Sequence, residues 1–248
     1  MNRFKQVAVV TAILTGCMLL LAACTKSNDG GPAPAPVTFK NKIAYFYKQD
    51  SADGVSYKAL LQANNCGVTL IDMGQLNKID FKFFDMVVID NNASDDAYDF
   101  ANATGAIKAA GKPVLMIGEG GGHFGEMINA AVNWGTCAPY SFPINMTVTD
   151  STSSLYKSPK KIQVPANRLL PIFSQSPYGQ AFLRSNYLQY PNVEFIGLAT
   201  VSNSNAFSVT LEAGKYGYWG YYNSVSAMSQ TGKDFMVNLT YYVGKLSL

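Results

Sequence analysis

Histidine, cysteine and charged residues are scarce in this chain of 248 residues. His123 is the one histidine, there are four cysteines, and Asp, Glu, Lys and Arg together make up 14% of the residues. One histidine without metal-ligand spacing excludes the common zinc sites, which draw on several His or Cys ligands. No run of Lys or Arg provides the basic surface of a nucleic-acid-binding protein. We therefore expect no metal, no cofactor and no nucleic-acid partner.

The long apolar run of the sequence lies at its N-terminus. Residues 7–23 carry no charge, follow Arg3 and Lys5, and end in Leu-Ala-Ala before Cys24. A basic start, an apolar centre and small residues at a cleavage point are the parts of a secretion signal. A membrane-spanning helix is the alternative, but the run is at the short limit for a span and contains Thr and Gly. We expect residues 1–23 to be a signal peptide.

The Leu-Ala-Ala-Cys24 sequence resembles the lipobox of bacterial lipoproteins. The resemblance implies that Cys24 carries the lipid, begins the mature protein and makes the membrane its partner. Residues 24–38 are polar and then Pro/Ala-rich, so we expect a flexible tether of up to roughly 40 Å. In lipoproteins an Asp after the cysteine favours the inner membrane. Thr25 stands there, which favours the outer membrane, at its periplasmic face or at the cell surface.

Removal of the signal peptide takes away Arg3 and Lys5, which leaves 17 basic residues against 16 acidic ones. A near-neutral domain favours small molecules, glycans or proteins as partners. Two cysteines then remain in the folded part, Cys66 and Cys137, and an oxidising envelope would permit a disulfide between them. We expect each near the C-terminal end of a helix, on opposite faces of a sheet. Two buried free thiols are therefore the favoured interpretation.

Residues 39–248 are expected to form a single α/β domain. Short apolar runs predict strands at 42–47, 68–72, 85–90 and 113–117, separated by helices at 54–63, at 95–110 and from a glycine run to about 134. Continuous apolar strands that alternate with helices are typical of a parallel sheet covered on both faces. We predict a three-layer, flavodoxin-like sandwich with a mostly parallel, doubly wound sheet, in which the first strand lies between the second and the third.

The second half of the chain has weaker patterns. They predict a strand at 144–148, a short helix at 179–184, strands at 193–200, 206–211 and 216–222, and a terminal helix at 231–243. In a doubly wound sheet the ligand crevice lies at the carboxyl ends of strands one, three and four. The residues expected there are Lys48, Gln49, Asp50, Asn91, Asn92 and the glycine run.

The sequence PVLMIGEGGGHF, residues 113–124, resembles the nucleophile elbow of class I glutamine amidotransferase-like proteins, where a buried strand leads into Gly-x-Cys-x-Gly-His and a helix. Gly118 and Gly122 match the glycines, His123 matches the histidine, and Gly120 stands at the position of the nucleophilic cysteine. GKYGYWGYYNS and the helix after it resemble the end of trehalose-utilisation-type members. The resemblance implies an amidotransferase-like domain without its nucleophile or a second, catalytic histidine, and hence without cysteine chemistry.

The residues near the predicted elbow allow a binding function. Amides of the glycine turn could hold an anion, and an aromatic strand end could stack on a sugar. Glu119 could act as an acid or base or accept local hydrogen bonds, and for His123 packing is favoured over metal binding. We predict a non-catalytic, envelope-anchored domain for a small polar or glycan ligand. Its candidate residues are Gln49, Asp50, Asn91, Glu119, Gly120, Gly121, His123 and Tyr222.

Two alternatives remain open at this point. One is a hydrolase that uses Glu119 together with Asp50 or Asp90. The other is a scaffold protein in an envelope complex.

Overall fold

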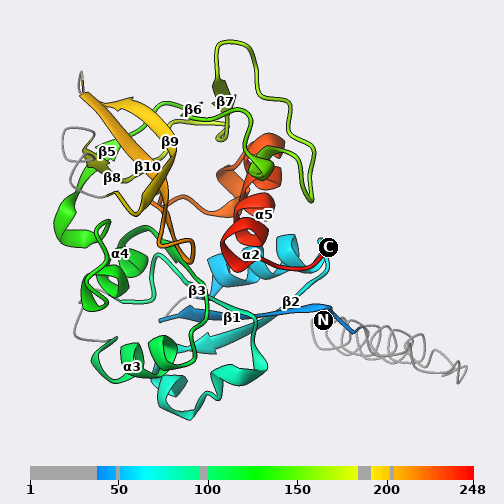
Figure 1. Cartoon of the computed structure of the whole chain (residues 1–248), viewed down its shortest axis with the longest axis vertical. Helices are drawn as coiled ribbons and strands as arrows, with labels where there is room; N and C mark the ends of the chain where they lie inside the picture. Colours follow the sequence, from blue (N-terminus) through cyan, green and yellow to red (C-terminus); the bar gives the residue numbers. More distant parts are fainter. Residues whose placement is uncertain (1–37, 49–50, 95–99, 184–190, 202–203) are drawn as a thin grey trace, which may run out of the picture. The chain divides into compact units, whose positions relative to one another are not determined.

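Five parallel strands form the centre of a computed structural model of the chain (Figure 1). In spatial order they are β2 (Cys66–Asp72), β1 (Asn41–Tyr47), β3 (Met86–Ile89), β4 (Val114–Ile117) and β11 (Tyr216–Trp219). The first strand lies between the second and third, so the predicted doubly wound order is confirmed. All five strands end at the same edge of the sheet, which we call the carboxyl edge, and all begin at the opposite amino edge.

The structure describes residues 38–48, 51–94, 100–183, 191–201 and 204–248. The predicted signal peptide, the tether with Cys24, and the candidate residues Gln49 and Asp50 lie outside the described residues. Within the described part, no helix is both long and apolar enough to cross a membrane.

Two pairs of helices cover the two faces of the parallel strands (Figure 1). α2 (Ala52–Gln62) and α5 (Gln230–Gly244) pack on one face, and α3 (Ala101–Ala109) and α4 (Gly118–Met127) pack on the other. The three-layer α/β prediction is thus confirmed. α4 ends earlier than the predicted residue 134, because the chain turns at Asn129, whose φ is 55°.

Alternating side chains of β1 supply the two cores. Ile43 and Tyr45 lie in the core under α2 and α5, whereas Ala44 and Phe46 lie in the core under α3 and α4. Successive side chains of a strand point to opposite faces, so one apolar run fills both layers. This explains why the strand sequences are apolar throughout rather than alternating with polar residues.

Antiparallel strands extend the sheet beyond β11. β10 (Ser204–Glu212) pairs with β11, and the order continues through β9 (Val193–Val201), β6 (Asn145–Val148) and β7 (Leu169–Pro171). β8 (Tyr178–Leu183) pairs with β10 and with β5 (Cys137–Ser141). Short 3₁₀ helices connect these strands and those of the first half: η1 (Met73–Lys78), η2 (Phe81–Phe83), η4 (Trp134–Thr136), η5 (Ser154–Tyr156) and η7 (Val225–Ala227).

The helix predicted at 179–184 is wrong, since this segment is strand β8. Its Ala, Gln, Phe and Leu residues suit a helix, but tertiary packing decides the outcome. A Cβ atom at Gly179 would lie 2.2 Å from the carbonyl oxygen of Gly220. The close approach of two backbones at this pair of glycines therefore holds β8 against the segment that follows β11.

The two cysteines of the folded part are free thiols. Each was expected near the C-terminal end of a helix. Cys66 opens β2 shortly after α2, and Cys137 opens β5 directly after η4. Cys66 lies in the core under α2 and α5, whereas Cys137 packs against the core under α3 and α4. The sheet separates the two sulfur atoms.

Candidate functional site

The turn from β4 into α4 is centred on Gly118. This residue has a φ of +53°, in the left-handed region that favours glycine, and it opens α4 directly after the strand. A nucleophile elbow places its nucleophile on such a strand-to-helix turn. The sequence resemblance placed the nucleophile position at Gly120. The structure moves this position by two residues to Gly118, because Gly120 already lies in the first turn of the helix.

The side chain of Asn91, which follows β3, fills the space above this turn. A Cβ atom at Gly118 would lie 2.1 Å from Asn91 Oδ1 and 2.8 Å from its Cγ. The same Cβ would lie 2.9 Å from a ring carbon of Tyr222. The Asn91 carboxamide thus occupies the volume in which a side chain at the elbow would begin.

Asn91 also occupies the backbone donors of the turn. Its Oδ1 accepts a hydrogen bond from the Glu119 N–H at 2.9 Å, and its carbonyl oxygen accepts one from the Gly120 N–H at 2.8 Å. The amide after an elbow nucleophile is normally an oxyanion donor. The expectation that Gly120 offers an open amide to an anion is wrong, because this donor is already satisfied within the protein.

The glycines of α4 serve close packing. Gly120 and Gly121 are both buried. Their Cβ atoms would lie 2.4 Å from the carbonyl oxygen of Asp90 and 2.5 Å from the carbonyl carbon of Met116. Only glycine lets the helix approach the backbones at the ends of β3 and β4 this closely. A ligand-facing position for these two candidates is therefore contradicted.

Asp90 lies in the core rather than in an open crevice. Its side chain is 1% exposed, and its Oδ1 accepts a hydrogen bond from the Asn91 N–H at 2.7 Å. Burial and, after it, the charge of Asp90 raise the pKa of Tyr45 and of Tyr57 well above the ordinary range. The carboxylate and the two phenols form a buried polar group beside the first turn of α4.

His123 is packed against η4, as the packing interpretation predicts. Its ring is 6% exposed and stacks on Trp134 with ring centroids 4.6 Å apart. Nε2 lies 3.9 Å from Glu119 Oε1, and Nδ1 lies 3.9 Å from Glu126 Oε2. Across the described residues, no group of three or more His, Cys, Asp and Glu side chains is arranged to hold a metal ion.

Glu119, Tyr178 and Tyr222 form the exposed part of this site, which we call the aromatic pair site. The rings of Tyr178 and Tyr222 meet edge to face with centroids 5.6 Å apart, and Tyr178 is 49% exposed. The Tyr222 N–H donates to the Tyr178 carbonyl oxygen at 2.9 Å. Burial, followed by the negative charge of Glu119, raises the pKa of Tyr222 above its ordinary value.

The sequence did not reveal Tyr178 as a partner of Tyr222, because it lies beside the segment predicted as a helix. Of the aromatic residues 216–222, Tyr218, Trp219 and Tyr221 are fully buried. Tyr216 and Tyr222 are the half-buried members that a ligand could reach. The sequence signal for an exposed tyrosine at this site was its position after the apolar and aromatic strand 216–219. This signal identified Tyr222 but not Tyr178.

A cavity of about 340 Å³ opens at the carboxyl edge nearer to β1 and β2. It is lined by Lys48, Asp72, Met73, Gly74 and Ala93. Lys48 follows β1, Asp72 ends β2 and Ala93 follows β3, so this cavity is displaced toward β2 from the crevice predicted at strands one, three and four. Among the predicted crevice residues, Lys48 lines it.

The thiols near these elements are unsuited to nucleophilic attack. Burial raises the pKa of Cys137 to about 12, against weaker opposing hydrogen bonds from Tyr218 and Thr136. Burial also raises the pKa of Cys66. The thiolate is the reactive form of cysteine, so both sulfur atoms stay protonated and inert at neutral pH.

The strand order, the two helix layers and the tight turn between β4 and α4 define a glutamine amidotransferase-like α/β fold. Comparison with solved structures gives the same class. A protein assigned as a GMP synthase subunit from Thermoplasma acidophilum superposes with a TM-score of 0.51 at 9% identity, covering 84% of this chain and 96% of that one. A chain of PurLQS from Thermotoga maritima gives 0.52 at 12% identity, covering 83% and 100%.

A glutamine amidotransferase from Thermotoga maritima gives a TM-score of 0.47 at 10% identity, covering 74% of this chain and 76% of that one. No family model and no curated protein matches the sequence. At these identities the similarity to solved structures establishes the fold alone.

Proposed function

We propose that this protein is a lipoprotein, anchored in the bacterial envelope through a lipid on Cys24, whose amidotransferase-like domain binds a ligand without cysteine-dependent catalysis. The observation that carries the absence of cysteine-dependent catalysis is the position of Asn91. Its carboxamide lies where an elbow side chain would begin, and it accepts the hydrogen bond of the Glu119 amide. A site that is filled by its own side chain cannot receive the atoms that a nucleophile would attack.

The remaining groups support the absence of cysteine chemistry. Gly118 offers no attacking atom, and the single histidine of the sequence is stacked on Trp134. Acyl transfer by cysteine requires a thiolate and a base within hydrogen-bond reach of it. Cys137 has a pKa of about 12 and is therefore a neutral thiol at physiological pH.

The aromatic pair site fits a hydroxyl-rich ligand such as a glycan. The exposed ring of Tyr178 offers an apolar face against which a sugar ring can stack. Glu119, whose side chain is 38% exposed, carries carboxylate oxygens that can accept hydrogen bonds from sugar hydroxyls. Gln49 and Asp50 stay proposed contributors to ligand binding.

The absence of amidotransferase chemistry is tested by measuring ammonia release from glutamine with the full chain. We expect no release above the rate of the heat-denatured protein. Release that persists after purification, and that is lost when Asn91 is replaced by Ala, would contradict the proposal. Anchoring is tested separately, since Cys24→Ala should abolish labelling by a lipid precursor.

Binding is tested on a glycan array with the full chain and two matched variants. Tyr178→Ala removes the exposed ring of the aromatic pair site, and Phe83→Ala removes a comparably exposed ring elsewhere. We expect any glycan signal to fall at least tenfold in Tyr178→Ala and to stay unchanged in Phe83→Ala. Equal signals from both variants would place the ligand outside the aromatic pair site.

A further inference from the structure

The amino edge of the sheet gathers lysines that are far apart in the sequence. The Asp85 N–H donates to the Lys42 carbonyl oxygen at 2.7 Å, and the Val114 N–H donates to the Lys215 carbonyl oxygen at 2.8 Å. Lys112 stands two residues before β4 at the same edge. The pairing of the parallel strands therefore produces a basic surface that no run in the sequence displays.

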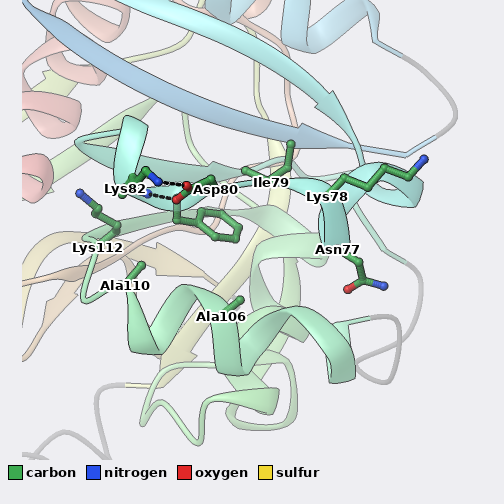
Figure 2. A pocket seen from close by; sticks show the side chains of 9 residues that line it. Asn77, Lys78, Ile79, Asp80, Lys82, Ala106, Ala110 and Lys112 are labelled. Atoms are coloured by element: carbon green, nitrogen blue, oxygen red, sulfur yellow. Dashed lines mark hydrogen bonds and ion pairs between the residues drawn. The ribbon is translucent and has the colours of Figure 1, made fainter.

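A surface groove continues this basic surface over α3 (Figure 2). The cavity has a volume of about 570 Å³ and lies between the η1–η2 segment and α3. Lys82 and Lys112 flank one end of it in Figure 2, and Lys78 lies toward the other. We call Lys42, Lys78, Lys82, Lys112 and Lys215, with this groove, the basic edge.

The acidic residues of this surface are engaged in local structure. Asp80 caps η2 by accepting a hydrogen bond from the Lys82 N–H and forms an ion pair with the Lys82 side chain. Asp85 Oδ2 accepts a hydrogen bond from the Lys42 N–H at 2.7 Å. Glu212, beside Lys215, accepts a hydrogen bond from the Ala131 N–H at 2.7 Å. Each of these three acids thus has a local partner, against the five lysines of the basic edge.

An exposed aromatic ring stands beside these charges. Phe83 is 62% exposed, and the Lys82 ammonium lies 4.8 Å from the centre of its ring. Phe83 ends η2, two residues before Asp85 at the amino edge. A solvent-exposed ring beside a cation, at the end of a row of lysines, suits the interface of an anionic bilayer, where the ring enters the headgroup region and the cations meet phosphate.

We propose that the basic edge docks on the surface of an anionic phospholipid membrane, with Phe83 inserted at headgroup depth. The place where the chain enters the fold supports a membrane as the partner of the basic edge. β1 begins at Asn41, so the described chain enters the fold at the amino edge. The proposal rests on the lipid anchor of the proposed function, because the tether from Cys24 then leads to the face that carries the lysines.

The test uses the full lipidated chain in vesicles and replaces Phe83 by Trp. Its fluorescence is measured with lipids brominated at known depths, and the signal of Trp134 and Trp219 is subtracted with the unsubstituted chain. We expect strong shallow quenching at position 83 in phosphatidylglycerol vesicles and little in phosphatidylcholine vesicles. The matched control, Tyr178→Trp, places the reporter on an exposed ring near the carboxyl edge and should show no quenching.

Charge reversal tests the electrostatic part. Each lysine near an anionic surface shifts the docked-to-undocked ratio by about fivefold. Lys82→Glu with Lys112→Glu should therefore abolish quenching of the Phe83→Trp reporter. The same charge change at Lys58 in α2 and Lys233 in α5, on the helices that cover the sheet face opposite α3, should leave it unchanged.

The outcomes distinguish this inference from the proposed function. A chain that fails to float with vesicles lacks the anchor, and both proposals then fail. A chain that floats but shows no quenching at position 83, or equal quenching in neutral and anionic vesicles, overturns the docking inference alone.

Discussion

The two edges of the parallel sheet differ in how their polar groups are satisfied. At the carboxyl edge, one asparagine that follows β3 accepts the hydrogen bonds of two amides in the turn that follows β4. At the amino edge, Lys42 and Lys82 are exposed to solvent, and Asp85 accepts a hydrogen bond at the surface. The turn between β4 and α4 is thus closed by the protein itself, whereas the lysines of the amino edge are open to a partner.

This difference shows how a fold can keep its geometry while its surface takes another role. Ligands of doubly wound sheets bind at the carboxyl edge because strand ends and helix N-termini converge there. In this chain the convergence is preserved, but Asn91 satisfies its donors. A function at the carboxyl edge is then left to side chains that reach the surface, such as Tyr178 and Tyr222.

The largest expected effect concerns the reactivity of Cys137. A reactive thiol there would supply a nucleophile near the carboxyl edge, and the contrast drawn between the two edges of the sheet would then fail. Its pKa of about 12 lies above the ordinary value of 9.0, so the native chain holds about a thousandfold less thiolate than the unfolded chain at pH 8. Alkylation by iodoacetamide, followed by mass spectrometry, should be slower by about this factor in the native protein. The native rate should rise as the pH approaches 12. Equal rates in the two states would contradict the burial of the thiol.

The packing of α4 predicts the next largest effect. Gly121→Ala places a Cβ 2.5 Å from the Met116 carbonyl carbon, so it should lower the free energy of unfolding by about 3 kcal/mol in urea titrations. The matched change Gly105→Ala lies in α3, where a Cβ would meet nothing within 4 Å. It should stabilise the protein by about 0.5–1 kcal/mol. Similar effects of the two changes would show that the glycines of α4 are not needed for packing.

The sequence predicted the parallel part of this fold because its signals are local. Apolar runs such as residues 42–47 and 113–117 fill both cores, and their alternation with helices determines the doubly wound order. The antiparallel part was harder, since strand β8 depends on the contact of Gly179 with Gly220 across a long loop. Residue propensities along the sequence carry no information about such a long-range contact.

The candidate site was predicted in place but not in detail. The glycine run marked the tight turn, yet the sequence alignment placed the elbow at Gly120 rather than Gly118. Asn91 was counted as a ligand-binding residue, whereas its side chain bonds to the Glu119 amide. The contacts of Asn91 with Gly118 and Glu119 decide these roles. The residues lie 27 and 28 positions apart in the sequence, and a single sequence does not show that they meet.

Two side-chain acceptors permit a direct comparison of the edges. Asn91→Ala leaves the Glu119 N–H of a partly buried hydrogen bond without its acceptor, so it should cost about 2 kcal/mol of unfolding free energy. Asp85→Ala removes an acceptor from an exposed N–H that water can satisfy, so it should cost less than about 1 kcal/mol. Chemical denaturation measures both. Equal costs would mean that the carboxyl edge is as open to water as the amino edge.

The smallest effects are expected at the exposed rings. Phe83→Ala and Tyr178→Ala remove side chains that are 62% and 49% exposed, so each should change the free energy of unfolding by less than about 0.5 kcal/mol. Thermal unfolding of the two variants checks this. A large loss of stability in either one would show that its ring serves the fold, and the glycan-binding test would then need the more conservative Phe83→Leu and Tyr178→Leu.

The filled elbow is tested most directly by a double-mutant cycle of Gly118→Ala and Asn91→Ala. A Cβ at position 118 would lie 2.1 Å from Asn91 Oδ1, so shortening Asn91 should relieve the clash. We predict that Gly118→Ala costs less unfolding free energy in the Asn91→Ala background, by about 1–2 kcal/mol. Additive costs would contradict the account, because they would mean that the Asn91 side chain does not occupy the elbow.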